Sequence, residues 1–207
     1  MRPPAYDLPE ELALPLASGA PYWYWLGGRP ALDFVNTRRE RWRRQVETLV
    51  TGADLGRWLV QAGVASPPAP RVPRDLLDDA RELREAIDAA VTAILEDRPA
   101  PRSAVVLIDD WLDHAAPRPH LALTDGGVPV LGERVPAAAA RRALGAIALD
   151  AATMLGSERE RGRIRICASD TCSARFYDRS PAGRRRWCSM NACGNVAKAR
   201  RHRARHA

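Results

Sequence analysis

The four cysteines of this chain of 207 residues all lie near its C-terminus, and their spacing constrains the fold more than any other feature. Cys167 and Cys172 form one C-x4-C pair, and Cys188 and Cys193 form a second pair after fifteen intervening residues. Two matched pairs at this separation are typical of a tetrahedral zinc site with four thiolate ligands. A segment as short as 161–207 buries little apolar surface, so we expect a bound metal to stabilise it. The spacing therefore predicts one structural Zn²⁺ held by these four cysteines.

Two other chemistries also use four cysteines. A pair of disulfides would require an oxidising compartment. The N-terminus carries Asp7, Glu10 and Glu11 among prolines, which is not the pattern of a secretory signal peptide, so we expect a reducing, cytoplasmic location. An iron–sulfur cluster takes four thiolates as well, but its usual ligand runs are spaced differently. No stretch approaches about 18 uninterrupted apolar residues, so we expect no membrane partner.

The charge of the chain is divided unequally between its two ends. Residues 161–207 hold thirteen basic and two acidic residues, a net charge of +11, whereas residues 1–160 have a net charge of −4. This asymmetry favours a polyanion-binding end attached to an ordinary domain. The alternative is a solvated basic tail that binds nothing.

Hydrophobic periodicity predicts that the first 160 residues are mainly helical. The clearest signal is the recurrence of apolar residues at three- and four-residue steps over 74–97, and weaker patterns predict helices over 103–115 and about 136–156. We expect a shorter helix from Asp54, acting as its N-cap, to Gln61.

Three further segments complete this first domain. Residues 121–131 predict a β-hairpin that turns at Asp125-Gly126-Gly127. Residues 31–37 form either a strand or a first helical turn, and the aromatic cluster 22–25 is expected to pack on the core. The expected fold class is α+β, with a mainly α-helical N-terminal domain over 1–160 that contains a small antiparallel β element.

The segment 161–207 predicts a small four-cysteine finger of treble-clef or ribbon-like form, a β-hairpin followed by a helix. Residues 163–166 form the first strand, and Phe176 and Tyr177 form both the second strand and the small core. A helix is expected to begin at Asn191 as its N-cap, which would place Cys193 in its first turn, where the helix dipole favours the thiolate.

The residues around the second cysteine pair resemble a known family. The run Trp187-Cys188-Ser189-Met190-Asn191-Ala192-Cys193-Gly194-Asn195, preceded by three arginines and by Phe176-Tyr177-Asp178-Arg179-Ser180, resembles the CGNR zinc finger. The N-terminal part is similar to the ABATE-type domain that accompanies this finger, on the strength of residues 31–37, 55–63 and 80–86. The resemblance implies a bacterial stress-induced transcription regulator with the four cysteines as zinc ligands. Val196 stands where the family motif has arginine, which leaves the ligands unchanged.

A metal-organised module that carries so much positive charge favours DNA as the partner. Arginines bind phosphate or read guanine, and asparagine is suited to reading adenine. The candidate nucleic-acid-binding residues are Arg184, Arg185, Arg186, Asn195, Lys198, Arg201 and Arg205. The alternative is a protein-interaction adaptor in which the zinc finger is structural and binds an acidic partner or RNA.

Other roles are expected to fall to the first domain. Asp33, Asn36 and Arg38 are polar residues in or beside an apolar segment, and they either line a ligand pocket or form a buried network that braces the fold. The domain is expected to bind a small-molecule effector or to form a homodimer. We expect no enzymatic activity, because four thiolates close a zinc site and the common catalytic motifs are absent.

Overall fold

The computed structural model describes residues 23–116, 118–134, 138–169, 172–195 and 198–199. Three long helices, α3 (Arg74–Leu95), α4 (Arg102–Leu112) and α5 (Ala139–Gly156), form the body with the shorter α1 (Pro30–Val35), α2 (Gly52–Gln61) and α6 (Glu158–Arg161). The strands pair as three separate antiparallel hairpins: β1 (Arg38–Arg39) with β2 (Val46–Glu47), β3 (Arg118–Leu123) with β4 (Pro129–Arg134), and β5 (Ile164–Ile166) with β6 (Arg175–Tyr177). The expected α+β class, mainly helical with small antiparallel elements, is confirmed.

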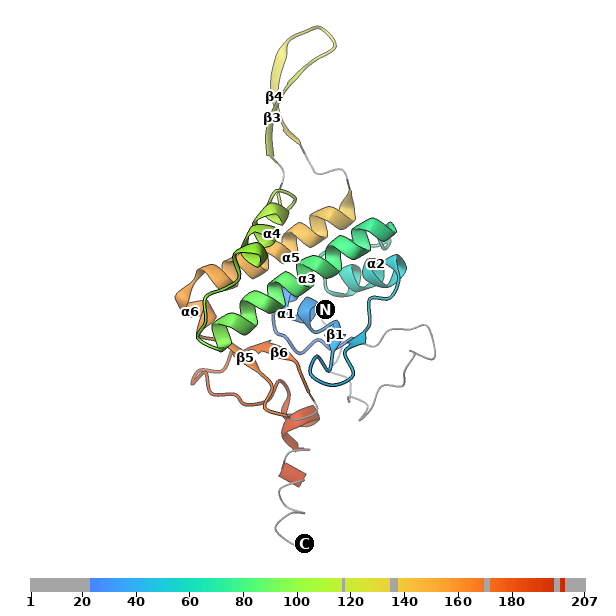
Figure 1. Ribbon diagram of the computed structural model, residues 1–207. Coiled ribbons are helices and arrows are strands. Elements are labelled where there is room, and N and C mark those ends of the chain that lie inside the picture. The colour runs from blue at the N-terminus through green and yellow to red at the C-terminus, as the bar shows by residue number, and fades with distance from the viewer. Residues whose placement is uncertain (1–22, 117, 135–137, 170–171, 196–197, 200–207) are drawn as a thin grey trace.

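The main core lies between the five helices α1 to α5 (Figure 1). The helix expected over 74–97 is confirmed, because α3 buries the apolar side chains that recur along it. Of the two alternatives for the segment 31–37, the helical one is found, because α1 spans Pro30–Val35 and Asn36 is its C-cap. Asp150 of α5 binds the start of α1, with its Oδ2 accepting a hydrogen bond from the amide of Ala31 at 2.9 Å and its Oδ1 lying 2.7 Å from Arg29. A carboxylate 119 residues away therefore takes the place of a local cap.

The start of α2 differs from the prediction. Thr51, and not Asp54, is the N-cap: the Thr51 hydroxyl accepts a hydrogen bond from the amide of Asp54, and the Asp54 carboxylate accepts one from the amide of Thr51 at 2.7 Å. This reciprocal pair is a capping box, which places Asp54 three residues inside the cap. The aromatic cluster packs on the core as expected for the residues described, since Trp23 is buried and Trp25 stacks on Trp58 with ring centroids 5.7 Å apart.

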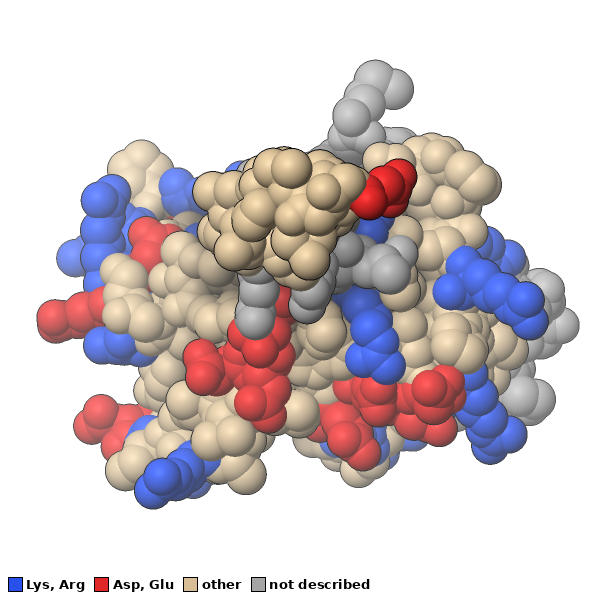
Figure 2. All heavy atoms as spheres, turned by 90° about the horizontal axis from the view of Figure 1, so that it is seen from above, with Lys and Arg blue, Asp and Glu red and all other residues tan. Residues whose placement is uncertain are grey.

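The hairpin of β3 and β4 projects from one end of the helical body (Figure 1). It turns at the predicted place, where Gly127 adopts a φ of +73° and its amide donates to the carbonyl of Thr124 at 2.9 Å. Its large apolar side chains are exposed: Leu121, Leu123, Val128, Val130 and Leu131. Seen from above, the hairpin is almost entirely uncharged, in contrast to the acidic and basic side chains around it (Figure 2).

The hairpin of β5 and β6 contributes to two cores. Ile164 belongs to the main helical core, whereas Phe176 packs with the cysteines in a second, smaller core. The two strands were predicted correctly, but the role expected for Tyr177 was wrong. Its ring packs on the main core and its hydroxyl donates a hydrogen bond to Glu160 at 2.8 Å. The finger is therefore joined to the body through side chains of its own first hairpin.

Candidate metal centre and nucleic-acid interface

The four cysteine sulfurs converge at one point. The Sγ atoms of Cys167, Cys172, Cys188 and Cys193 all lie within 4.8 Å of one another. The distance from Cys172 to Cys188 is 3.9 Å, and that from Cys188 to Cys193 is 3.7 Å. Zn–S bonds of about 2.3 Å give a tetrahedron with S···S edges of about 3.8 Å, whereas a disulfide needs about 2.05 Å. The four cysteines thus form a site for one zinc ion.

The thiols respond strongly to one another. Hydrogen bonds from Cys172 and from the other two thiols lower the pKa of Cys167, whereas the hydrogen bond to Cys167 is the main cause that raises the pKa of Cys188. Four adjacent thiols cannot all ionise alone, because thiolates repel one another. A divalent cation would stabilise all four thiolates, and four protein ligands would complete its coordination and make the site structural.

Backbone hydrogen bonds hold the two cysteine-bearing turns in place. The amide of Cys167 donates to the carbonyl of Ala174 at 2.9 Å, and the amide of Ala168 donates to that of Arg186 at 2.8 Å. The second turn is helical over Met190–Gly194, and the carbonyl of Ser189 accepts from the amide of Cys193 at 3.1 Å. Asn191 was expected to be the N-cap, but it lies inside this turn because the first helical hydrogen bond begins two residues earlier. Cys193 still lies in the first turn.

Asp178 organises the arginine-bearing loop. It is fully buried, and its carboxylate accepts hydrogen bonds from the amide of Ser180 at 2.9 Å and from that of Arg185 at 2.8 Å. Burial raises the pKa of Asp178, but these hydrogen bonds outweigh burial and lower it overall. The carboxylate therefore stays ionised and fixes the turn that leads into residues 184–186. No role was predicted for Asp178 beyond its place in the CGNR-like run, although an aspartate two residues before Ser-Pro-Ala-Gly is a recognisable turn signal.

The three arginines of this loop are all exposed, but they differ in their contacts. Arg185 donates from Nη2 to the carbonyl of Cys188 at 2.6 Å and lies over the ring of Phe176, so it braces the finger. The guanidinium of Arg186 lies over Trp187, 5.1 Å from the ring centroid. Arg184 projects from the same loop. Of the other candidates for nucleic-acid binding, Asn195 and Lys198 are exposed, whereas Arg201 and Arg205 lie outside the described residues. Val196, which replaces the motif arginine, also lies outside them.

Two of the candidate pocket residues brace the fold. The amide group of Asn36, 5% exposed, makes two hydrogen bonds to the backbone of Arg175: Nδ2 donates to its carbonyl at 2.9 Å, and Oδ1 accepts from its amide at 2.8 Å. Asp33 is also buried, and its Oδ1 accepts a hydrogen bond from the amide of Gly27 at 2.7 Å. Neither residue is among those that line the cavity described next, and their hydrogen bonds fit the alternative of a buried network that braces the fold.

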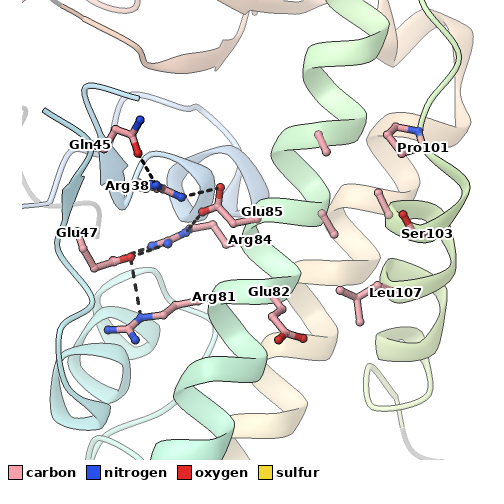
Figure 3. Close-up of a pocket in the computed structure, with 13 residues that line it drawn as sticks. Arg38, Gln45, Glu47, Arg81, Glu82, Arg84, Glu85, Pro101, Ser103 and Leu107 are labelled. Atoms are coloured by element: carbon pink, nitrogen blue, oxygen red, sulfur yellow. Dashed lines mark hydrogen bonds and ion pairs between the residues drawn. The ribbon is translucent and has the colours of Figure 1, made fainter. Parts of the chain in front are cut away.

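Arg38, the third candidate, does line a cavity. This open cavity of about 770 Å³ lies between β2, α3 and the start of α4 (Figure 3). Arg38 donates to Gln45 at 2.7 Å and lies 3.4 Å from Glu85. Arg84, with only 2% of its side chain exposed, donates to both carboxylate oxygens of Glu47 at 2.7 and 2.6 Å. Figure 3 shows that these charged groups bridge β2 and α3, while Pro101, just before α4, and Leu107 of α4 lie on the other side.

The ionic network behind this cavity was missed from the sequence. Burial lowers the pKa of Arg84, but the hydrogen bonds and charges of Glu47 and Glu85 outweigh burial and raise it overall. The network continues to the finger, because Arg41 lies between Glu85 and Asp88, and Asp88 is 2.7 Å from Arg175 of β6. The sequence did contain one indication of this network. Arg84 lies on the apolar face of α3, directly after Leu83 and about one turn before Ile87.

A closed four-cysteine site on a hairpin and a helical turn, braced against a helical domain, defines a two-part zinc-finger protein. Comparison with family models gives the same division. Residues 28–158 match the ABATE family, described as "Putative stress-induced transcription regulator", and residues 163–206 match the CGNR zinc finger. The chain belongs to the ABATE family and carries a CGNR zinc finger, as the sequence motifs indicated. A search of curated proteins finds no match. Within the part of the chain that the structure describes, none of the helices has the length and apolar character to cross a membrane.

Proposed function

We propose that this protein is a DNA-binding transcription regulator of the bacterial stress-related type and that its C-terminal finger binds the DNA. The observation that carries the proposal is the four-cysteine site, which joins the two cysteine pairs of a strongly basic module. Charge runs in a flexible tail are usually only solvated, but here hydrogen bonds fix the loop of Arg184 and Arg186, and the turn from Cys193 leads into the exposed Asn195 and Lys198. The description of the family as a transcription regulator supports a regulatory role.

The test is a titration of labelled duplex DNA with the zinc-loaded protein at a series of salt concentrations. If about five of the basic candidates contact phosphate, the logarithm of the binding constant falls with the logarithm of salt with a slope of about −4.5. Chelation of the zinc should abolish binding, because the basic residues lose their common scaffold. Retention of one zinc without DNA binding at low salt would overturn the proposal and leave the finger as a structural clip for an acidic protein or RNA.

A matched pair of variants separates finger contacts from general charge. Replacing both Arg184 and Arg186 by alanine should weaken binding and reduce the salt slope by about 1.8, with zinc content unchanged. The control is Arg71→Ala, an exposed arginine between α2 and α3. An equal effect of the control would show that binding follows net charge alone.

We further propose that the β3–β4 hairpin forms a homodimer contact with the hairpin of a second copy. Leu121 and Leu131 pair across the strands at 67% and 76% exposure, and Leu123, at 70%, lies on the same face. Isolated two-stranded hairpins are marginally stable in water, so this one gains by pairing. Asp125, at the turn, is the only charged residue between His120 and Gly132, so the hairpin offers little to a charged partner.

The exposed apolar area predicts a weak dimer. Each fully buried aliphatic side chain removes about 100 Å² from water, so the three leucines of this face offer about 200 Å² per copy. Two copies give about 400 Å², below the about 1,200 Å² of a standard stable interface. Light scattering should therefore show the mass rising from 22.8 kDa toward twice that value as concentration increases. Leu121→Ser with Leu131→Ser should abolish this rise, whereas Val105→Ser, a half-exposed residue on α4, should not. A monomer at all concentrations would overturn the proposal.

A further inference from the structure

The loop between β1 and β2, residues 40–45, presents an aromatic and a basic side chain at the finger end of the molecule. Trp42 is 48% exposed, which is unusual for so large an apolar group, and Arg43 is exposed next to it. Figure 1 shows this loop on the same side of the helical body as β6 and the C-terminal helical turn, opposite the β3–β4 hairpin. The loop belongs to the N-terminal domain, and none of the motifs of the finger includes it.

The conformation of the loop is tightly determined. Glu40 and Gln45, its first and last residues, adopt positive φ values of 46° and 53°, a region that residues other than glycine rarely occupy. The carbonyl of Glu40 accepts hydrogen bonds from the amides of Arg43 at 2.8 Å and Gln45 at 3.0 Å. The carboxylate of Glu40 is buried and holds Arg44 through its Nε at 2.8 Å. Such strained residues persist only where the surrounding contacts impose them, and they cluster at functional sites.

The loop is also attached to the metal centre. The amide of Arg41 donates to the hydroxyl of Ser173 at 3.0 Å, and Ser173 directly follows the zinc ligand Cys172. The guanidinium of Arg41 is directed inward, 2.6 Å from Glu85, whereas that of Arg175 lies 5.8 Å from the ring of Trp42. The contacts with the finger therefore position the indole of Trp42. Arg41, in contrast, is ion-paired with carboxylates of α3.

We infer that this loop is a second DNA-contacting element, next to the finger, that binds the sugar–phosphate backbone of the same duplex. In this arrangement Arg43 contacts a phosphate, and the indole of Trp42 packs its face against sugar and base edges while its Nε1–H donates to a backbone oxygen. The inference rests on the proposed DNA-binding function. Two observations favour nucleic acid over protein: the nearest surface is the +11 finger, and the only carboxylate of the loop, that of Glu40, is buried and paired.

The contacts predict two different effects of mutation. Arg43→Ala removes one phosphate contact, so it should weaken binding to all duplex sequences alike and reduce the salt slope by about 0.9. Trp42→Ala removes a half-exposed apolar surface, so it should weaken binding by about fivefold with the salt slope unchanged. Trp42→Phe keeps an aromatic face and should retain most of the affinity. Zinc content should stay at the wild-type value in all three, because neither residue is a zinc ligand.

The experiment is the same titration of a labelled duplex at a series of salt concentrations. It is run on the wild-type protein, the three loop variants, the Arg184/Arg186 double variant and the Arg71→Ala control. Loop variants that bind like the wild type, beside a weakened double variant, overturn this inference and leave the finger as the DNA reader. A wild-type protein that does not bind duplex DNA overturns both proposals. A loss that Trp42→Ala shows only on a single-stranded RNA of the same sequence also overturns it, since stacking on unpaired bases would then be the function of the indole.

Discussion

Replacing Asn36 by alanine tests whether the finger depends on the helical domain for its stability. The Asn36 side chain bonds both polar groups of the Arg175 backbone, at 2.9 and 2.8 Å, in a site that is 5% exposed. With alanine, the amide and the carbonyl of Arg175 lose these partners in a buried position. A buried polar group without a partner costs about 1–3 kcal/mol, so the two together should cost about 3 kcal/mol even if water satisfies one in part. For a chain of this size, that corresponds to a decrease in melting temperature of about 6–12 °C.

The assay is thermal unfolding followed by circular dichroism, together with the rate at which zinc passes to a coloured chelator. Arg175 lies three residues after Cys172, so the variant should release zinc faster as well as melt earlier. Asn195→Ala, an exposed asparagine in the finger, is the matched control and should change neither value. A melting temperature within 1 °C of the wild type would refute the reasoning, because two buried hydrogen bonds would then contribute nothing measurable.

Three further predictions concern the metal, the packing and the pH dependence. Cys188→Ser leaves three thiolates, so metal analysis should find well under one equivalent of zinc; full retention would contradict the four-ligand site. In Gly145→Ala the new Cβ would lie 2.5 Å from the backbone carbon of His114, so urea unfolding should show a loss of about 1–3 kcal/mol; an unchanged midpoint would contradict this packing. Burial raises the pKa of Glu85, but Arg41 and Arg84 outweigh burial and lower this pKa overall to below the usual 4.5. The ionised Glu85 therefore stabilises the folded protein fully above pH 4.5, and this stabilisation is lost as the pH falls through the lowered pKa. The stability difference between wild type and Glu85→Gln should accordingly shrink in acid; a constant difference would show that the Glu85 charge does not matter.

The parts of the fold that sequence could predict are those determined locally. The apolar recurrence over 74–97 predicted α3, which ends at Leu95, because a helix that buries one face needs that spacing. The spacing of the cysteines predicted the zinc site, because the two members of each pair are only five residues apart in the sequence. Thr51 was missed as the cap of α2 although Thr-Gly-Ala-Asp has the spacing of a capping box, so that error was avoidable.

The remainder depended on contacts between residues far apart in the chain. The amide of Asn36 and the carbonyl of Gly27 both bond the backbone of β6, at Arg175 and Tyr177, across about 140 residues or more. No local pattern marks such partners, because an asparagine beside an apolar segment fits a pocket as well as a brace. The same holds for the loop at Trp42, whose shape depends on Ser173 and on the buried network behind it.

The two-sided hairpin of β5 and β6 has a consequence for how such a protein can be divided or recombined. The family models meet between residues 158 and 163, yet Ile164, just beyond that point, fills part of the helical core. If the protein were divided there, the upstream fragment would have a cavity where Ile164 packs. The downstream fragment would have an unpaired edge of β6, which bonds Gly27 and Asn36 in the intact protein. The boundary between the two sequence families therefore differs from the boundary of the packed core in this protein. Any other C-terminal module could replace this finger only if it supplied a strand pair that fits the same gap.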